Sequence, residues 1–398
     1  MTHPLIIIGT GLAGWSTARE FRKLDSATPV LLITADGGHF YAKPSLSNAF
    51  AQKRTPEQLV STPAARMVET QNVTLLAHTR VEAINPATQT VTTSKGVFHY
   101  SQLVLATGAQ PIRVPVAGDA ADQVLSINSL DDFSAFHAQL TGAGEKHVLI
   151  MGAGLIGCEF ANDLAASGYQ VTVVDPSDGP IAALLPAAAG AELREALSRL
   201  GVTWHFGATV KSVNRAPGIG GGLPRPALQV ELSNGQLAPV DIVLSAIGLR
   251  ANTVLAQAAG LACERGVVVD AALQTSAPHI YALGDSAQYA SAGSRTLPYV
   301  MPIMSAARAL AATLAGTRTE VVFPLMPVGI KTPALPIVVA APAPGTPGEW
   351  RSAAPTVPGE MAESGIWHFM GLKGQHLGFV LTGQQTSRRA EQAKLVVA

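Results

Sequence analysis

Short, uninterrupted runs of apolar residues recur along the chain, and two of them lead into similar glycine-rich segments. Residues 6–8 (III) precede residues 9–14 (GTGLAG), and residues 149–151 (LIM) precede residues 152–157 (GAGLIG). Such a run is typical of a parallel strand that is buried on both faces. Amphipathic stretches follow at 15–24 and 158–167 and indicate helices. The order of strand, tight turn and helix is therefore predicted twice.

Each predicted helix is followed by another apolar run that ends near an acid. Residues 30–33 (VLLI) come before Asp36, and residues 171–174 (VTVV) come directly before Asp175. Both copies therefore have the strand–helix–strand order of a nucleotide-binding unit. Further elements are strands predicted at 103–106, 242–246, 267–269, 280–283, 366–370 and 377–381 and a helix at 303–314.

These elements predict an α/β protein with two Rossmann-like dinucleotide-binding domains, followed by a small C-terminal α+β module. We place the first domain at residues 1–112 and 241–320, the second at 113–240 and the module at 321–398. The length of 398 residues agrees, because one hydrophobic core rarely serves so long a chain. Residues 341–358 are rich in Pro and Gly and predict a loop within the module.

Each G-x-G-x-x-G motif assigns a separate role to its three glycines. The first permits a tight turn, the second lets the backbone approach a pyrophosphate, and the third lets the helix pack on the strand. The phosphate then lies at the helix N-terminus, where the helix dipole favours an anion. The resulting candidates for nucleotide binding are Gly9, Thr10, Gly11, Leu12, Ala13 and Gly14 in the first motif and Gly152, Gly154, Leu155, Ile156 and Gly157 in the second.

The acids that follow the motifs are candidates for contacts with ribose. Asp36, or the backbone at Thr34 and Ala35, would hold the first ribose, although Asp36 also begins an Asp-Gly-Gly turn signal and a turn role stays open. Asp175 would accept a hydrogen bond from an unphosphorylated ribose and repel a 2′-phosphate. No Lys or Arg follows it within residues 176–179. The second site therefore favours NADH over NADPH.

Similar turns close both predicted domains. Ala106, Thr107 and Gly108 follow one predicted strand, and Gly248 follows another. Gly284 and Asp285 also end a strand, which places a carboxylate beside a close backbone approach; taken alone, that pair is an ordinary turn or helix cap. Two dinucleotide sites in one chain are explained by hydride transfer between a nicotinamide and a tightly held flavin. The sequence therefore predicts FAD and NAD(H) as cofactors.

Composition narrows the remaining classes of function. Lys plus Arg and Asp plus Glu each number 27, so no overall charge recruits nucleic acid or an anionic membrane. Two cysteines far apart offer neither a disulfide framework nor a metal site, and we expect a cytoplasmic protein with no bound metal. We also expect no signal peptide and no membrane span. The oligomeric state stays open, and a monomer is compatible with the sequence.

The motifs together resemble the bacterial rubredoxin-NAD(+) reductases over essentially the whole chain. The segments that carry the resemblance are residues 9–14 (GTGLAG), 33–38 (ITADGG), 40–47 (FYAKPSLS), 152–163 (GAGLIGCEFAND), 280–287 (IYALGDSA), 299–302 (YVMP) and 331–334 (KTPA). The resemblance implies FAD on the first domain, NADH on the second and rubredoxin as electron acceptor, often in alkane hydroxylation or oxygen detoxification.

The resemblance also implies roles for single residues. Lys43, next to Pro44, would lie by the flavin, and Glu159 would pair with Lys43 and help to place the nicotinamide. The other implied flavin contacts are Val81 at the adenine, Thr107 and Gly108 along the cofactor channel, Asp285 at the ribityl chain, Val300 at the flavin ring and Lys331 from the C-terminal module.

Simpler roles remain open for several of these residues. Glu159 could have no role beyond a favourable interaction with the dipole of its helix, and Lys43 could be a solvated cation. We assign Cys158 to packing, although a thiol at a helix N-terminus can also have a lowered pKa. Related oxidases, peroxidases and disulfide reductases carry a redox cysteine where this chain has residues 43–47 (KPSLS), which argues against thiol chemistry.

Two rival functions remain. The chain could reduce another small iron–sulfur protein, such as the ferredoxin of an oxygenase, or oxygen itself. It could also be a flavoprotein that senses NADH, although long basic segments like those of apoptosis-inducing factor are missing from its sequence.

Overall fold

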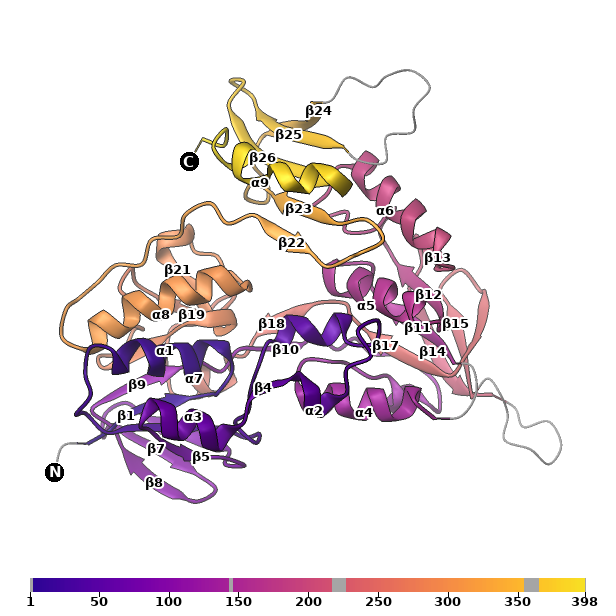
Figure 1. Cartoon of the computed structure of the whole chain (residues 1–398). Coiled ribbons are helices and arrows are strands. Elements are labelled where there is room, and N and C mark those ends of the chain that lie inside the picture. Colours follow the sequence, from indigo (N-terminus) through magenta and orange to yellow (C-terminus); the bar gives the residue numbers. More distant parts are fainter. Residues whose placement is uncertain (1–2, 143–145, 217–226, 354–364, 398) are drawn as a thin grey trace. The chain divides into compact units, whose positions relative to one another are not determined.

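The computed structural model describes residues 3–142, 146–216, 227–353 and 365–397. The chain divides into two compact units (Figure 1). Unit 1 consists of Met1–Ala42, Glu57–Gln110 and Leu249–Met326, and unit 2 consists of Lys43–Pro56, Pro111–Gly248 and Pro327–Ala398.

Unit 1 is built on a parallel five-stranded sheet. Its strands, in spatial order, are β20 (Ile280–Ala282), β9 (Gln102–Leu105), β1 (Leu5–Ile8), β2 (Val30–Ile33) and β5 (Thr74–Leu76). All four residues of β1 are buried, as its continuous apolar run predicts. The helices of this unit are α1 (Leu12–Arg22), α3 (Ala64–Gln71), α7 (Val254–Ala258) and α8 (Val300–Leu314), and α1 and α8 lie side by side (Figure 1).

Smaller elements complete unit 1 and its junctions. They are the sheet β6 (Val81–Asn85), β7 (Thr90–Thr93) and β8 (Gly96–His99), the pairs β3 (Phe40–Tyr41) with β4 (Val60–Thr62), β10 (Ala109–Pro111) with β18 (Leu249–Ala251) and β19 (Val267–Val269) with β21 (Ala287–Tyr289), and the short helix α2 (Pro56–Leu59).

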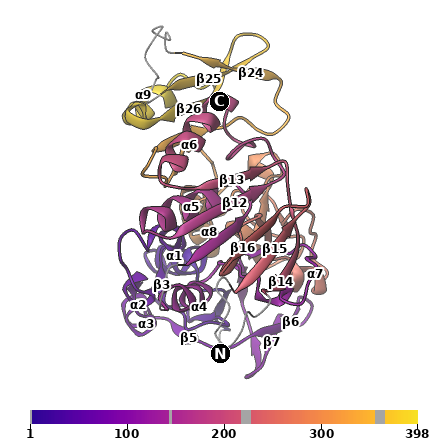
Figure 2. The same ribbon diagram turned by 90° about the vertical axis from the view of Figure 1, so that its right-hand side faces the viewer.

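Unit 2 contains a second parallel sheet of the same kind. Its strands, in spatial order, are β13 (Thr203–Phe206), β12 (Gln170–Asp175), β11 (His147–Met151) and β17 (Ile242–Ser245). Figure 2 shows the helices α5 (Leu155–Ala166) and α6 (Ala187–Arg199) beside β12 and β13. Further elements of this part are α4 (Leu130–Leu140), the 3₁₀ segments η1 (Lys43–Asn48) and η2 (Ala121–Gln123) and the sheet β14 (Val210–Arg215), β15 (Leu228–Leu232) and β16 (Leu237–Val240).

The C-terminal part of unit 2 forms an antiparallel sheet, followed by the 3₁₀ segment η5 (Gly383–Arg388) and a short helix. We call it the C-terminal sheet; its strands in spatial order are β22 (Val328–Ile330), β23 (Ile337–Ala340), β26 (His376–Thr382), β25 (Ile366–Gly371) and β24 (Gly348–Ser352), with α9 (Arg389–Ala393) after them. Strand β24 lies inside the segment 341–358, which the sequence predicted as a loop, because pairing with β25 overrides its Pro and Gly content. Residues 354–358 of that segment lie outside the described residues.

The compact units divide the chain at different residues from the predicted domains. Strand β17 pairs in parallel with β11, so residues 242–248 belong to unit 2 and the first domain resumes at Leu249 rather than at residue 241. Residues 43–56, placed with the first domain in the prediction, also belong to unit 2, because Asp163 of α5 binds the backbone N–H groups of Phe50 and Ala51.

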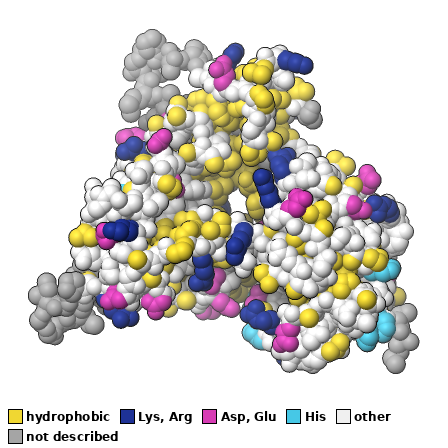
Figure 3. All heavy atoms as spheres, turned by 180° about the vertical axis from the view of Figure 1, so that it is seen from behind, with side chains coloured by type: hydrophobic (Ala, Val, Ile, Leu, Met, Phe, Trp, Pro, Cys, Tyr) yellow, Lys and Arg dark blue, Asp and Glu magenta, His cyan; other side chains and the backbone are white. Residues whose placement is uncertain are grey.

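The described residues include no helix with the length and apolar character that crossing a membrane requires. On the face seen in Figure 3, basic and acidic side chains both occur among uncharged ones, in keeping with equal numbers of each charge in the sequence.

Candidate functional site

The first glycine-rich turn has the geometry of a phosphate-binding loop. Gly9 has a φ of +105°, and a Cβ there would lie 2.2 Å from the carbonyl oxygen of Ala106. A Cβ on Gly14 would lie 1.9 Å from the carbonyl oxygen of Gly9, so no larger residue fits either position. Gly11 is the N-cap of α1, and a Cβ there would meet no atom within 4 Å. Open space therefore lies at the helix N-terminus, where a pyrophosphate would bind.

The second turn repeats this geometry in unit 2. Gly152 has a φ of +102°, and a Cβ on it would lie 2.7 Å from the carbonyl oxygen of Ala246. A Cβ on Gly157 would lie 2.0 Å from the carbonyl oxygen of Gly152, whereas Gly154, the N-cap of α5, has open space. The candidates Leu155 and Ile156 are the first two residues of that helix.

The first acid candidate is held within its own turn. The Oδ1 atom of Asp36 accepts hydrogen bonds from Thr34 Oγ1 at 2.7 Å, the N–H of Gly38 at 2.9 Å and Thr10 Oγ1 at 3.2 Å. The turn role that the sequence left open is therefore present. It does not exclude a ribose contact, because a carboxylate has a second oxygen with its own lone pairs. The third candidate of this strand end, Ala35, is exposed.

The second acid also connects its strand to the glycine turn. Asp175 Oδ2 accepts the N–H of Ala153 at 2.6 Å, and its Oδ1 accepts the N–H and the hydroxyl of Ser177 at 2.7 and 2.5 Å. Oδ2, which accepts only one hydrogen bond, retains capacity for a further donor, such as a ribose hydroxyl. The negative charge of the carboxylate disfavours a phosphate group beside it.

The other candidates of unit 1 follow the carboxyl ends of its parallel strands. Ala106, Thr107 and Gly108 come after β9, and Gly284 with Asp285 comes after β20. Ligands of open α/β sheets bind at this edge. Thr107 donates its hydroxyl to the carbonyl of Asn252 at 3.0 Å. Of the two remaining candidates, Val81 begins β6 and Val300 begins α8 with 41% of its surface exposed.

A buried tyrosine fixes the turn that carries Asp285. Tyr289 is fully buried, and its hydroxyl accepts the N–H of Gly284 at 2.7 Å and lies 3.3 Å from the carbonyl oxygen of the same residue. Gly284 has a φ of +78°, and a Cβ there would lie 2.9 Å from the Cβ of Ala13 in the first glycine motif. Sequence reasoning missed Tyr289, because nothing in a strand pattern reveals which side chain reaches back to the preceding turn.

The expected pairing of Glu159 with Lys43 is wrong. Glu159 is 1% exposed, and its carboxylate forms a salt bridge with Lys331 and accepts the hydroxyl of Ser47 at 2.5 Å. Lys43 instead donates a hydrogen bond from Nζ to Asn128 Oδ1 at 3.0 Å. The physical reason is that Lys331 follows β22, which brings its backbone N–H as well as its ammonium group to the same carboxylate.

Cys158 has the environment of a packing residue. It is buried in α5, and its Sγ lies 3.3 Å from the carbonyl oxygen of Ala153. Burial raises the pKa of the Cys158 thiol far above its ordinary value, and the nearby carboxylates of Asp175 and Glu159 raise it further. A thiol in this state is a poor nucleophile.

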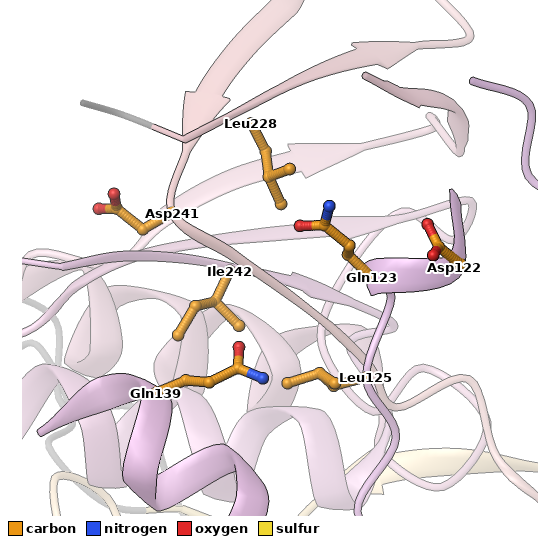
Figure 4. A pocket seen from close by; sticks show the side chains of 7 residues that line it. All are labelled: Asp122, Gln123, Leu125, Gln139, Leu228, Asp241 and Ile242. Atoms are coloured by element: carbon orange, nitrogen blue, oxygen red, sulfur yellow. The ribbon is translucent and has the colours of Figure 1, made fainter. Parts of the chain in front are cut away.

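Unit 2 also contains a cavity of about 410 Å³ whose lining includes no residue of either glycine turn. Figure 4 shows its lining residues, Asp122, Gln123, Leu125, Gln139, Leu228, Asp241 and Ile242. Strand β17 begins at Ile242, so this cavity lies by the amino end of that strand, whereas Gly152 and Asp175 follow carboxyl ends. Nucleotides bind at the carboxyl ends of parallel strands.

Residues 3–312 match the family model of the pyridine nucleotide-disulphide oxidoreductases. The chain belongs to this family. As a pyridine nucleotide-disulphide oxidoreductase it is an enzyme that uses FAD and NAD(H), and the two glycine turns with open helix N-termini fit two such dinucleotides. Residues 320–396 match a second model, the rubredoxin binding C-terminal domain, which confirms that a C-terminal module follows the two Rossmann-like parts of the chain.

Individual relatives support the same assignment. The chain is 43% identical to a rubredoxin-NAD(+) reductase of Alcanivorax borkumensis over 98% of each protein. It is 39% identical to a nitric oxide reductase FlRd-NAD(+) reductase of Aeromonas salmonicida, over 97% of this chain and 95% of that protein. The crystal structure of a covalent putidaredoxin reductase–putidaredoxin complex superposes with a TM-score of 0.84 at 25% identity, covering 99% of this chain and 93% of the other. The resemblance to the rubredoxin-NAD(+) reductases is thereby confirmed.

Proposed function

We propose that this protein transfers electrons from NADH, through bound FAD, to rubredoxin. One observation carries the proposal: two glycine turns of matching geometry precede a C-terminal segment, residues 320–396, that matches the rubredoxin binding domain. Bound FAD supplies the chemistry of accepting a hydride from NADH and releasing electrons singly to an iron centre. The residues of the chain bind and orient the two nucleotides and keep each in its place.

In unit 1, the first turn of α1 binds the FAD pyrophosphate through backbone N–H groups next to Gly11. Asp36, held by Thr34 and Thr10, orients the adenosine ribose. Tyr289 keeps Gly284 in place, and the following Asp285 would hold the ribityl chain. Further contacts in this unit are assigned to Val81, Ala106, Thr107, Gly108 and Val300.

In unit 2, the first turn of α5 binds the NAD pyrophosphate next to Gly154. Asp175 accepts hydrogen bonds from the ribose hydroxyls and selects against a 2′-phosphate by charge. Glu159 positions the nicotinamide with the help of Lys331, and Gly248 closes the strand end beside this site. Only the family resemblance supports the proposed contacts of Lys43 and Pro44 with the flavin.

The test compares electron acceptors with a single preparation of FAD-loaded enzyme. Under anaerobic conditions, NADH is mixed with catalytic enzyme and oxidised rubredoxin, and loss of the visible absorbance of rubredoxin is followed. Parallel reactions contain a [2Fe–2S] ferredoxin, oxygen, or NADPH in place of NADH. We expect fast, NADH-specific reduction of rubredoxin and slow turnover in every other reaction.

Two other results would assign a different function. Preferential reduction of ferredoxin would leave the cofactors in place and replace the acceptor. Slow turnover with every acceptor, together with an NADH-dependent change in oligomeric state, would favour an NADH-sensing flavoprotein. The relatives named for FlRd make that acceptor of the nitric oxide reductase a useful fifth reaction. A cytoplasmic location, which two widely spaced cysteines favour, is part of the proposal and is tested by cell fractionation.

A further inference from the structure

Helix α5 of unit 2 carries three buried polar residues on one face. Glu159 is 1% exposed, Asn162 2% and Asp163 1%. Residues three and four positions apart in a helix are neighbours, so these side chains lie together. Charged side chains are almost never buried to this degree without partners. The hydrogen-bond partners of these three side chains therefore show which segments of the chain the helix binds.

The three side chains bind two segments that are distant in sequence. The carboxylate of Asp163 accepts the N–H groups of Phe50 at 2.9 Å and Ala51 at 2.8 Å. Asn162 Oδ1 accepts the N–H of Ala334 at 3.0 Å. Helix α5 thus holds the segment after η1 on one side and the segment after β22 of the C-terminal sheet on the other.

Glu159 binds η1 itself and the segment after β22 at the same time. Its Oε1 accepts the backbone N–H of Lys331 at 2.9 Å, and its Oε2 accepts the ammonium group of Lys331 and the hydroxyl of Ser47. Lys331 Nζ also donates to Ser47 Oγ at 3.1 Å. Removing one member of a buried charge pair leaves the other uncompensated. The positions of Glu159 and Lys331 therefore depend on each other.

The same helix begins at the second glycine turn. Gly154 is its N-cap, and Glu159 lies in the following turn. The carboxylate of Glu159 would repel a pyrophosphate at the helix N-terminus, and the ammonium group of Lys331, held against that carboxylate, would offset the repulsion, with little screening because the pair is largely buried. Binding of a dinucleotide and the geometry of this pair must therefore influence each other.

We propose that Lys331 is a positioning residue that couples NAD(H) binding on α5 to the C-terminal sheet. Lys331 directly follows β22 and belongs to the segment that matches the rubredoxin binding domain. NAD(H) strengthens the contacts of residues 331–334 with α5, and those contacts strengthen the binding of NAD(H) by the same factor. The inference rests on the proposed function for the identity of the acceptor, whereas the coupling itself requires only NAD(H).

Hydrogen exchange of the holoenzyme tests the coupling directly. The amides of Lys331 and Ala334 both donate to side chains of α5, so a peptide covering them reports on these contacts. Exchange is measured with and without saturating NAD⁺ in the wild type, Lys331→Met and Lys331→Arg. Lys373→Met is the matched control, because Lys373 lies exposed in the turn between β25 and β26 of the same sheet.

We expect NAD⁺ to slow exchange of this peptide severalfold in the wild type, in Lys331→Arg and in Lys373→Met, but not in Lys331→Met. The dissociation constant for NAD⁺ should rise about tenfold in Lys331→Met, a typical size for coupling between sites, and return most of the way in Lys331→Arg. A purely structural role of Lys331 would change exchange equally with and without NAD⁺.

The coupling is absent if NAD⁺ leaves wild-type exchange unchanged, or if Lys331→Met retains the full NAD⁺ effect. Should Lys331→Met lose its FAD or its fold, the double variant Glu159→Gln/Lys331→Met removes both charges and leaves neither uncompensated. That variant should fold, and NAD⁺ should not slow hydrogen exchange of the peptide in it. If NAD⁺ still slowed exchange, the proposal would be overturned. Failure to reduce rubredoxin, with the NAD⁺ effect intact, would remove the acceptor and not the coupling.

Discussion

The two nucleotide-binding helices begin alike and then differ in what they contact. The second residue after the third glycine is Ser16 in α1 and Glu159 in α5. Ser16 lies 3.5 Å from the sulfur of Met304 in α8, so α1 packs on a helix of its own unit. Glu159 binds Lys331 and Ser47 instead. The glycine motif therefore fixes the phosphate-binding turn, and the residues after it decide which part of the protein the helix holds.

The largest expected effects come from the open glycines at the two helix N-termini. Alanine is sterically allowed at Gly11 and at Gly154, because a Cβ meets no protein atom within 4 Å and neither residue has a positive φ. The methyl group would enter the space of the pyrophosphate and weaken binding by about 2–3 kcal/mol, roughly 100-fold.

This pair of variants separates the two sites. Gly11→Ala should lose FAD during purification, whereas Gly154→Ala should keep its flavin spectrum and lose affinity for NADH, measured by anaerobic titration. If Gly154→Ala lost FAD, or Gly11→Ala retained it with wild-type affinity, the assignment of one nucleotide to each turn would be wrong.

The next effect concerns the helix face that only α5 uses. Asp163→Ala leaves the N–H groups of Phe50 and Ala51 without their acceptor and should lower the free energy of unfolding by about 2–3 kcal/mol. The equivalent residue of α1 is Glu20, which pairs with Lys23 at 2.7 Å near the surface. Glu20→Ala should change the free energy of unfolding by less than about 1 kcal/mol. Denaturant titration of both variants measures the difference; equal losses would contradict the comparison.

A smaller effect is expected from two buried tyrosines of unit 1. Tyr289→Phe removes the acceptor of the Gly284 N–H and should weaken FAD binding by about 1–2 kcal/mol without changing the affinity for NADH. The hydroxyl of Tyr100 is buried and has no hydrogen-bond partner among the described residues. Tyr100→Phe should therefore leave FAD binding unchanged and stability unchanged or slightly higher. Equilibrium release of FAD, followed by fluorescence, distinguishes the two variants.

The smallest effect is a pH dependence of the C-terminal sheet. Burial lowers the pKa of His376 below its ordinary value of 6.5, and the nearby His368 lowers it further. Below pH 6.5 the unfolded chain therefore binds more protons than the folded chain, so stability falls as the pH falls through this range. The loss should be less than about 1 kcal/mol, because the site is partly screened by solvent. Unfolding measured from pH 7.5 to 5.0 should show it in the wild type, and a His376→Asn variant that retained the same slope would refute it.

The sequence predicted those parts of the fold that a local pattern encodes. The buried runs of β1 and β11 and the glycines between strand and helix were identified because hydrophobic periodicity and turn chemistry act over neighbouring residues. Cys158 was assigned to packing, and its burial agrees.

The sequence did not predict which segments contact each other when they lie far apart along the chain. Strand β17 follows the sheet of β14, β15 and β16, and its pairing with β11 shows that it belongs to unit 2. The sequence predicted that Glu159 pairs with Lys43. Its partner in the structure is Lys331, which lies even farther from Glu159 along the chain. A usable signal was present in α5, because Glu159, Asn162 and Asp163 interrupt an otherwise apolar helix at the spacing of a single face.

The most direct test of electron transfer through two separate nucleotide sites is one anaerobic titration of the FAD-loaded enzyme. NADH is added in small steps while the visible absorbance of the flavin is recorded, and oxidised rubredoxin is then added. The account predicts that NADH bleaches the flavin at much lower concentrations than NADPH does, and that rubredoxin restores the absorbance. A flavin that stays oxidised with excess NADH would contradict the account.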